Sequence, residues 1–278
     1  MYLSTSLFAD FSLAIADQPA CGDGQANARL AKGLLLVREG QDLVEKAVGF
    51  GVPIVKRGPR TIFPGSIHLA ENQECGDWSV TATYEMNLVE RLARAGSISP
   101  TSTPFYAARD ALAALHRRLP LLRGVLTGTS NMLRRIFGWA TIFEETTTCA
   151  SVTVTYDVYA DEGRVHVVID LGGVPKTSVS EVMIMNELGA RAFNRYFDAA
   201  GTSLEGAAIG TWNKVAAESA TFVCAGCGVS FSLRQAPEAR LYRGRELVGS
   251  RLAWSGFGYS LPPAAKQFSY DVHFARTP

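Results

Sequence analysis

The sequence predicts a mainly β protein made of long antiparallel strands, and three observations support this fold class. Apolar and polar side chains alternate over residues 78–88 and again over 268–274, which is the period of a strand with one buried face. Short turn-like segments such as 38–40 and 57–59 separate the apolar runs, and connections this short join antiparallel strands only. The 26 glycines suit the turns and bends of a strongly curved sheet.

The segment 152–171 is predicted to be a β-hairpin with its loop at residues 160–163. The loop contains Asp-Glu-Gly, and the glycine can adopt the left-handed conformation that tight turns require. The expected cross-strand pairs are Val158–Val165, Tyr156–Val167 and Val154–Ile169 on the apolar face, and Tyr159–Arg164, Asp157–His166 and Thr153–Asp170 on the polar face. A shift of one residue would mix the two faces, so the pattern specifies this register.

Further strands are predicted at the remaining apolar runs, namely 33–37, 43–48, 52–56, 61–69, 220–233 and 241–259. The N-terminal segment 1–16 is apolar but lacks a basic leader, so it is interpreted as folded structure and not as a secretory signal. The triplet Gly49-Phe50-Gly51 lacks the third glycine and the following helix of a dinucleotide-binding motif. It is interpreted as a strand kinked by glycine.

One helix is predicted over residues 103–119 in the middle of the chain. Thr103 can cap it, Pro104 suits its first turn, and apolar residues then recur every three or four positions as far as Leu119. A second helix can follow at 130–137. We therefore expect a single β-rich domain over residues 1–278, which can be divided into strands (1–100), a helical insert (101–138) and strands (139–278).

This organisation fits a large antiparallel two-sheet sandwich or a curved, barrel-like sheet with one or two helices inserted near the middle of the chain. Such an architecture resembles the galactose-mutarotase-like supersandwich. That resemblance implies the handling of carbohydrate on a concave sheet face, and it rests on architecture alone.

Composition limits the partners. With 27 Lys and Arg against 26 Asp and Glu, the net charge is +1, and a neutral chain has no general field to attract nucleic acid or an anionic membrane. The arginines around 117–135 and the basic turn at 56–60 are interpreted as solvated surface. No apolar run reaches the roughly 20 residues of a membrane span. The five scattered cysteines suggest reduced thiols and a cytoplasmic location.

The pair Cys224 and Cys227 forms a Cys-x-x-Cys motif between strand-like segments. Two thiolates at this spacing could supply half of a zinc site or a redox pair. The alternative is two reduced thiols across a bend, because a closed zinc site needs four ligands and the chain has no second such motif. No metal or cofactor is therefore expected.

Four residues are candidates for acid–base catalysis. His166 opposite Asp157 resembles a base with an orienting carboxylate, although exposed cross-strand charge pairs are common without function. Glu187 follows the apolar run 182–185, where burial would raise the pKa of a carboxyl group; the alternative is that Asn186 and Glu187 open a turn. Glu85 lies on the polar side of the 78–88 strand.

Three residues are candidates for ligand binding. Trp254 and Tyr259 lie beside glycines and could form a flat platform for a sugar ring, with Asn186 as a polar contact. Packing against a neighbouring sheet is the structural alternative for the two aromatic residues.

The sequence leaves three functions open. The first is an enzyme or enzyme-like protein acting on carbohydrate at a sheet face, where a histidine and a carboxylate would meet in one pocket. The second is a non-catalytic binder of an apolar or amphipathic small molecule in a closed cavity between sheets. The third is a structural protein that associates with copies of itself through an apolar surface.

Overall fold

The structure, a computed structural model, describes residues 1–17, 30–58, 60–72, 77–94, 139–177, 179–248 and 252–277. The chain divides into two compact units, one of residues 1–88 and 146–278 and one of residues 89–145. In the smaller unit the described residues are the end of β7 (Trp78–Arg94) and β8 (Trp139–Glu145), which pair with each other. The predicted helices at 103–119 and 130–137 lie outside the described residues.

The larger unit is mostly β and entirely antiparallel in its described pairings. A small sheet has the strand order β1 (Tyr2–Phe8), β2 (Phe11–Ala16), β3 (Leu35–Arg38) and β4 (Gln41–Asp42). The N-terminal segment is thus folded as strands.

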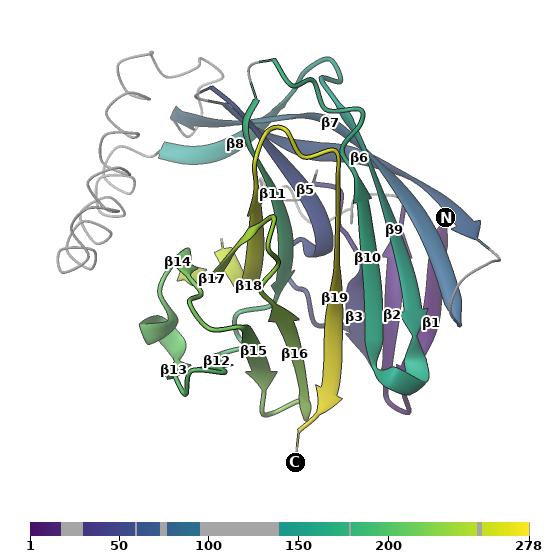
Figure 1. Cartoon of the computed structure of the whole chain (residues 1–278), viewed down its shortest axis with the longest axis vertical. Helices are drawn as coiled ribbons and strands as arrows, with labels where there is room; N and C mark the ends of the chain where they lie inside the picture. Colours follow the sequence, from purple (N-terminus) through teal and green to yellow (C-terminus); the bar gives the residue numbers. More distant parts are fainter. Residues whose placement is uncertain are drawn as a thin grey trace. The chain divides into compact units, whose positions relative to one another are not determined.

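A large sheet of 15 strands contains the remaining strands. Its order begins with β13 (Ser203–Glu205), β12 (Arg195–Asp198), β15 (Ser219–Cys224), β16 (Val229–Arg234), β19 (Gln267–Arg276), β10 (Arg164–Asp170) and β9 (Ser151–Tyr159). It continues with β7, β6 (Arg60–Asn72), β5 (Gly49–Arg57), β11 (Val179–Leu188), β18 (Leu252–Leu261), β17 (Arg240–Val248) and β14 (Asn213–Lys214), with β8 beside β7. Figure 1 shows β9, β10 and β19 as neighbouring strands.

The predicted hairpin is confirmed in every pair. β9 and β10 are joined by the 3-10 turn η2 (Ala160–Glu162), and Gly163 adopts the left-handed conformation that closes it. The register places Val158 opposite Val165 and Asp157 opposite His166. The same register continues to both neighbours, β7 and β19. The alternating pattern therefore determined which side chains share a face.

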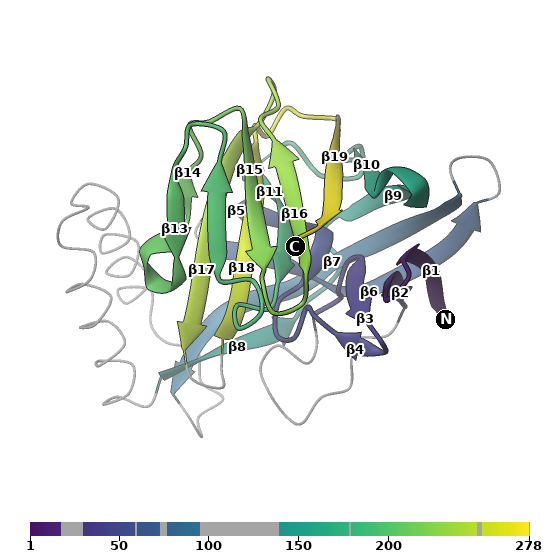
Figure 2. The same ribbon diagram turned by 90° about the horizontal axis from the view of Figure 1, so that it is seen from below.

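The core forms where the large sheet packs against itself. Phe50 of β5 contacts Phe231 of β16 and Phe274 of β19, with ring centroids 5.2 and 5.3 Å apart. Phe257 of β18 contacts Phe222 of β15 at 4.8 Å. In Figure 2, β15 and β16 lie in front of β18. Close aromatic packing from both parts of the sheet fills the space between them.

Buried tyrosines also join the two parts of the sheet. The Tyr156 hydroxyl donates to the Phe50 carbonyl at 2.9 Å and bonds to the Tyr84 hydroxyl. The Tyr270 hydroxyl donates to Asn186 Oδ1 at 2.6 Å, and the same oxygen accepts the Gly51 N–H. Because buried polar groups are costly without partners, these bonds hold β5 and β11 in place against β9 and β19.

Several sequence-based boundaries need correction. Residues 43–48, predicted as a strand, form turns after the two-residue β4. The segments 220–233 and 241–259 each contain two strands. Residues 49–51 do start a kinked strand, with positive φ at Gly49 and Gly51. Within the described ranges the only helical elements are 3-10 turns, namely η2 and η3 (Gly206–Ile209), and none is a helix that could cross a bilayer.

Candidate functional site

A row of polar side chains crosses four neighbouring strands on the side of the sheet that faces away from the core. The register aligns Ser79 of β7 with Asp157 of β9, Asp157 with His166 of β10, and His166 with Asp271 of β19. We call this side of β9, β10 and β19 the open face. It exists because polar residues occupy every second position of each strand.

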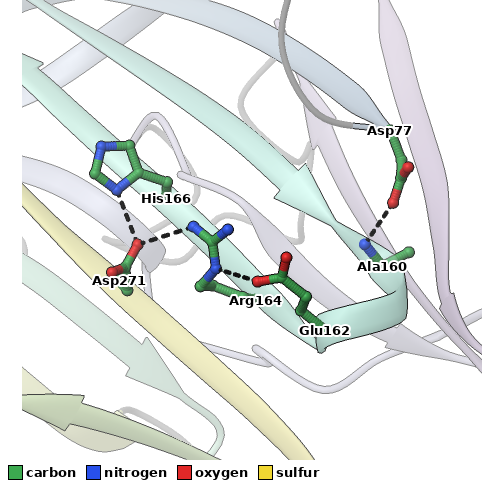
Figure 3. Close-up of polar contacts among 6 residues, drawn as sticks. All are labelled: Asp77, Ala160, Glu162, Arg164, His166 and Asp271. Carbon is green, nitrogen blue, oxygen red and sulfur yellow. Dashed lines mark hydrogen bonds and ion pairs between the residues drawn. The ribbon is translucent and has the colours of Figure 1, made fainter.

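His166 and Asp271 form the closest polar pair of the open face. His166 Nδ1 lies 2.8 Å from Asp271 Oδ1, and the two side chains are 34% and 40% exposed. Arg164 Nη1 approaches the same oxygen at 3.4 Å, while its Nε donates to Glu162 at 2.7 Å. Figure 3 shows Asp271 between the histidine and the arginine. A histidine and a carboxylate thus meet, but on an accessible surface.

The contact between His166 and Asp271 selects the tautomer of the imidazole. An ionised carboxylate only accepts hydrogen bonds, so the proton of neutral His166 resides on Nδ1. Nε2 then carries the free lone pair, and among the described residues it has no hydrogen-bond partner. This arrangement leaves Nε2 available to accept a hydrogen bond.

Arg164 is another polar residue of the open face. Its guanidinium carbon lies 3.9 Å from the centre of the Tyr159 ring, and its charge is balanced by Glu162 and Asp271. The loop before β10 is held by Asp77, whose carboxylate accepts the Ala160 N–H at 2.8 Å (Figure 3). Neutralisation of the arginine by two carboxylates suits an uncharged polar ligand better than an anion.

Asp157 does not orient His166 as the sequence suggested. It is 9% exposed, and its Oδ1 accepts a 2.6 Å hydrogen bond from Ser79 Oγ. His166 bonds instead to the carboxylate on its other side, Asp271. Pairing in register places Asp157 opposite His166, but the serine on β7 competes for the carboxylate. Asp157 is therefore a buried member of the row whose carboxylate is bonded to Ser79.

Glu85, the second carboxylate expected near His166, lies elsewhere on β7. It pairs with Ser151, six positions along the strand from Ser79. At about 3.4 Å per residue this separates it from the row by roughly 20 Å. Glu85 therefore does not reach His166.

Glu187 lies within β11 and not in a turn. It pairs with Gly49 of β5 and Gly256 of β18, and the side chain is largely buried. Burial raises the pKa of this carboxyl group from 4.5 to about 8, a hydrogen bond from the Val48 backbone lowers it, and the charge of Glu246 raises it. Glu187 is consequently protonated at neutral pH, as the sequence suggested for a buried acid.

Trp254 is buried and packs against a second indole. It is 8% exposed and stacks on Trp212 with centroids 4.8 Å apart. Carbon atoms of its ring would touch a methyl group added to Gly244, and those of Trp212 would touch one added to Gly258. We call this side of β11, β18 and β17 the closed face, because the two indoles lie over its glycines.

Tyr259 and Asn186 point to the interior. They are 1% and 0% exposed. The Tyr259 hydroxyl donates to the Arg234 carbonyl at 2.5 Å, and Asn186 accepts from Tyr270. Both positions alternate with Glu187 or Gly258 along their strands, so the β period turns them toward the core. They bind the layers together and do not contact a surface ligand.

Sequence reasoning missed Asp271 and Trp212. Asp271 stood in a predicted strand, but its role depends on β19 lying beside β10, a pairing between residues about 100 positions apart that local periodicity does not reveal. Trp212 lies in a bend and has positive φ, at 52°. No strand pattern signals it.

The described residues contain no group of three or more His, Cys, Asp or Glu side chains that could hold a metal ion. Cys224 and Cys227 are joined by a disulfide, which corrects the expectation of reduced thiols at these positions. Cys149 is a free thiol whose pKa is raised by burial.

Among the described residues, the interior gives little support for the small-molecule binder predicted as an alternative. A cavity lined by Val55, Ile62, Cys149 and neighbouring residues has a volume of about 10 Å³, which is room for about one water molecule. The space between β5, β16, β18 and β19 is filled by aromatic rings.

No protein-family model matches the chain, and no curated protein matches its sequence. Among solved structures, the α-N-acetylgalactosaminidase NagBb from Bifidobacterium bifidum in its GalNAc complex aligns with a TM-score of 0.52 and 9% identity. The alignment covers 99% of this chain and 36% of that chain. A galactose mutarotase-like protein from Lactobacillus casei ATCC 334 aligns with a TM-score of 0.39 and 12% identity over 99% of this chain and 100% of that chain. The first likeness is one of fold.

Proposed function

We propose that the protein is a carbohydrate-active protein and that the open face is its binding and catalytic surface. The observation that carries this proposal is the contact between His166 and Asp271, with Arg164 on the same carboxylate oxygen. It provides an oriented base beside several hydrogen-bonding groups on a sheet face. The finer architecture that we propose is supersandwich-like, with this face concave.

An uncharged sugar suits the chemistry of the site. Its hydroxyl groups can donate to Asp271 and accept from Arg164, and the charges of these groups largely cancel. The α-N-acetylgalactosaminidase with a similar fold was solved with GalNAc, so GalNAc and galactose are the first ligands to test.

The simplest sugar reaction that one acid–base group can drive is the interconversion of anomers. His166 Nε2 would take the proton from the C1 hydroxyl, the bond between C1 and the ring oxygen would break, and water would protonate that oxygen. Rotation about the C1–C2 bond and reversal of these steps would close the ring as the other anomer. Asp271 would stabilise the imidazolium formed in between.

Two NMR measurements test the proposal. Saturation-transfer spectra of the full chain with galactose and GalNAc should show binding, and exchange spectra should show anomer interconversion faster than in buffer. H166Q should reduce the catalysed rate by about 100-fold or more, whereas H68Q, which alters an exposed histidine of β6, should leave it unchanged. Equal rates for H166Q and the unaltered chain, or no sugar binding at millimolar concentration, would refute the proposal.

Self-association through an apolar surface stays a prediction. No observation on the described residues favours it over the carbohydrate site.

A further inference from the structure

The Cys224–Cys227 disulfide lies at the end of the β15–β16 hairpin, away from the residues of the open face. Cys224 is the last residue of β15, and Cys227 belongs to the turn 225–228 that leads into β16. Their Cα atoms are 5.3 Å apart. A disulfide at an accessible turn can exchange with other thiols, whereas a buried disulfide is protected.

The two cysteine residues differ in accessibility. Cys224 is 1% exposed, whereas Cys227 is partly exposed. The two residues between them, Ala225 and Gly226, are exposed, and a methyl group added to Gly226 would meet no atom within 4 Å. An attacking thiolate therefore has open access to the Cys227 side of the bond.

A hydrogen bond favours Cys224 Sγ as the leaving group in an exchange reaction. The Cys227 backbone N–H donates to Cys224 Sγ at 3.1 Å. When the bond breaks, negative charge develops on this sulfur, and a hydrogen bond to the charged form favours its release.

The hairpin does not depend on the disulfide for its shape. β15 and β16 pair from Ser219 and Arg234 to Cys224 and Val229. The Cys224 carbonyl also accepts the N–H groups of Cys227 and Gly228 at 3.2 and 3.0 Å. Closing so short a loop removes little entropy from the unfolded chain. The bond can therefore open without loss of the fold.

We propose that Cys224–Cys227 is a thiol–disulfide exchange site for a dithiol. A thiolate of the dithiol attacks Cys227 Sγ and forms a mixed disulfide, and the Cys224 thiolate leaves with the bonding electron pair. The second thiolate of the dithiol then attacks the other sulfur of the dithiol, which is bonded to Cys227 Sγ in the mixed disulfide. The Cys227 thiolate leaves with the bonding electron pair. Both cysteines take up two electrons in total, and the dithiol is oxidised to a disulfide.

Single-cysteine variants test the direction of attack. Reduced C224S and C227S are treated with glutathione disulfide, and the mixed disulfide is located by peptide mass spectrometry, so other thiols do not interfere. Cys227 in C224S should react at least about tenfold faster than Cys224 in C227S. Comparable rates at Cys224 and Cys227 would overturn the proposal.

A second measurement uses the unaltered chain and does not depend on the variants. Dithiothreitol should convert the oxidised protein to the dithiol form with an unchanged circular dichroism spectrum and a melting temperature lower by no more than about 5 °C. Unfolding on reduction would contradict the proposal, because the bond would then be a structural link.

Discussion

The open and closed faces are built from the same alternating strands, yet they differ in what covers them. On the open face Asp271 is 40% exposed and shares its charge with His166 and Arg164. On the closed face Glu187 is largely buried, pairs with Gly49 and Gly256 and has a hydrogen bond to the Val48 backbone. The indole pair Trp212 and Trp254 lies over other glycines of this face.

This difference shows that strand alternation sorts side chains into two groups but does not decide which outward groups meet water. On the open face solvent reaches the Asp271 carboxylate. Burial on the closed face makes Glu187 a neutral acid whose proton is linked to folding. Four predictions test this difference between the open and closed faces.

The largest loss of stability is expected from G256A on the closed face. The added methyl group would lie 2.0 Å from the Asn186 carbonyl oxygen and 2.8 Å from the Glu187 Cα, and backbone atoms cannot move aside cheaply. We expect a loss of about 3 kcal/mol or more in unfolding free energy. G226A, where the methyl group has open space, should change stability by less than about 0.5 kcal/mol. Urea denaturation compares them, and equal stability would disprove the close packing.

E187Q should change how stability depends on pH. The pKa of Glu187 in the folded chain, about 8, is above its ordinary 4.5, so the folded state binds the proton more tightly. The stability that this proton contributes is complete below about pH 4.5 and is lost as the pH rises through about 8.

Glutamine cannot ionise, so E187Q should lack this loss and should exceed the unaltered chain by roughly 3–5 kcal/mol at pH 9. Urea denaturation at pH 5, 7 and 9 provides the measurement. Parallel pH profiles for the two proteins would show that Glu187 is not neutral in the fold.

D157A tests the buried support of the open face. It leaves the Ser79 hydroxyl, which is 3% exposed, without its carboxylate acceptor. We expect a loss of about 2 kcal/mol in unfolding free energy. D161A, at an exposed position of η2, is the matched control and should be nearly neutral in thermal melts. If D157A left the unfolding free energy unchanged, Asp157 would have to be solvated in the folded chain.

The smallest effect on stability is expected for D271N. An exposed pair contributes less than about 1 kcal/mol, so its melting curve should resemble that of the unaltered chain. Sugar-dependent anomer exchange should nevertheless fall, because the imidazole of His166 loses its orienting carboxylate. If D271N destabilised the chain as much as D157A, the dyad would be a structural contact.

Local pattern was sufficient for much of the fold. Apolar residues at every second position identified β7, β9, β10 and β19, and the turn at 160–163 determined the register of the hairpin. The strand predicted at 43–48 failed because an apolar sequence there packs in turns after β4. The order of strands in the large sheet was beyond prediction, since neighbours such as β19 and β10 are about 100 residues apart.

The candidate site was only partly predictable for the same reason. The alternation identified His166 and Asp157 as neighbours. It could not show that Asp157 would bond to Ser79 and that His166 would bond to Asp271. Tyr259 and Asn186 were misplaced because a sheet packed on itself buries polar groups that have partners across the layers.

The strands at the two ends of the strand order in the large sheet affect how copies of the chain can associate. Its two outermost strands, β13 and β14, have three and two residues, and η3 packs against β12, β13 and β17 near both of them. Such short strands offer few main-chain groups for a foreign strand to pair with. Concentrated solutions of the protein should thus resist amyloid-like stacking at these two margins, where a contact between copies would have to use side chains.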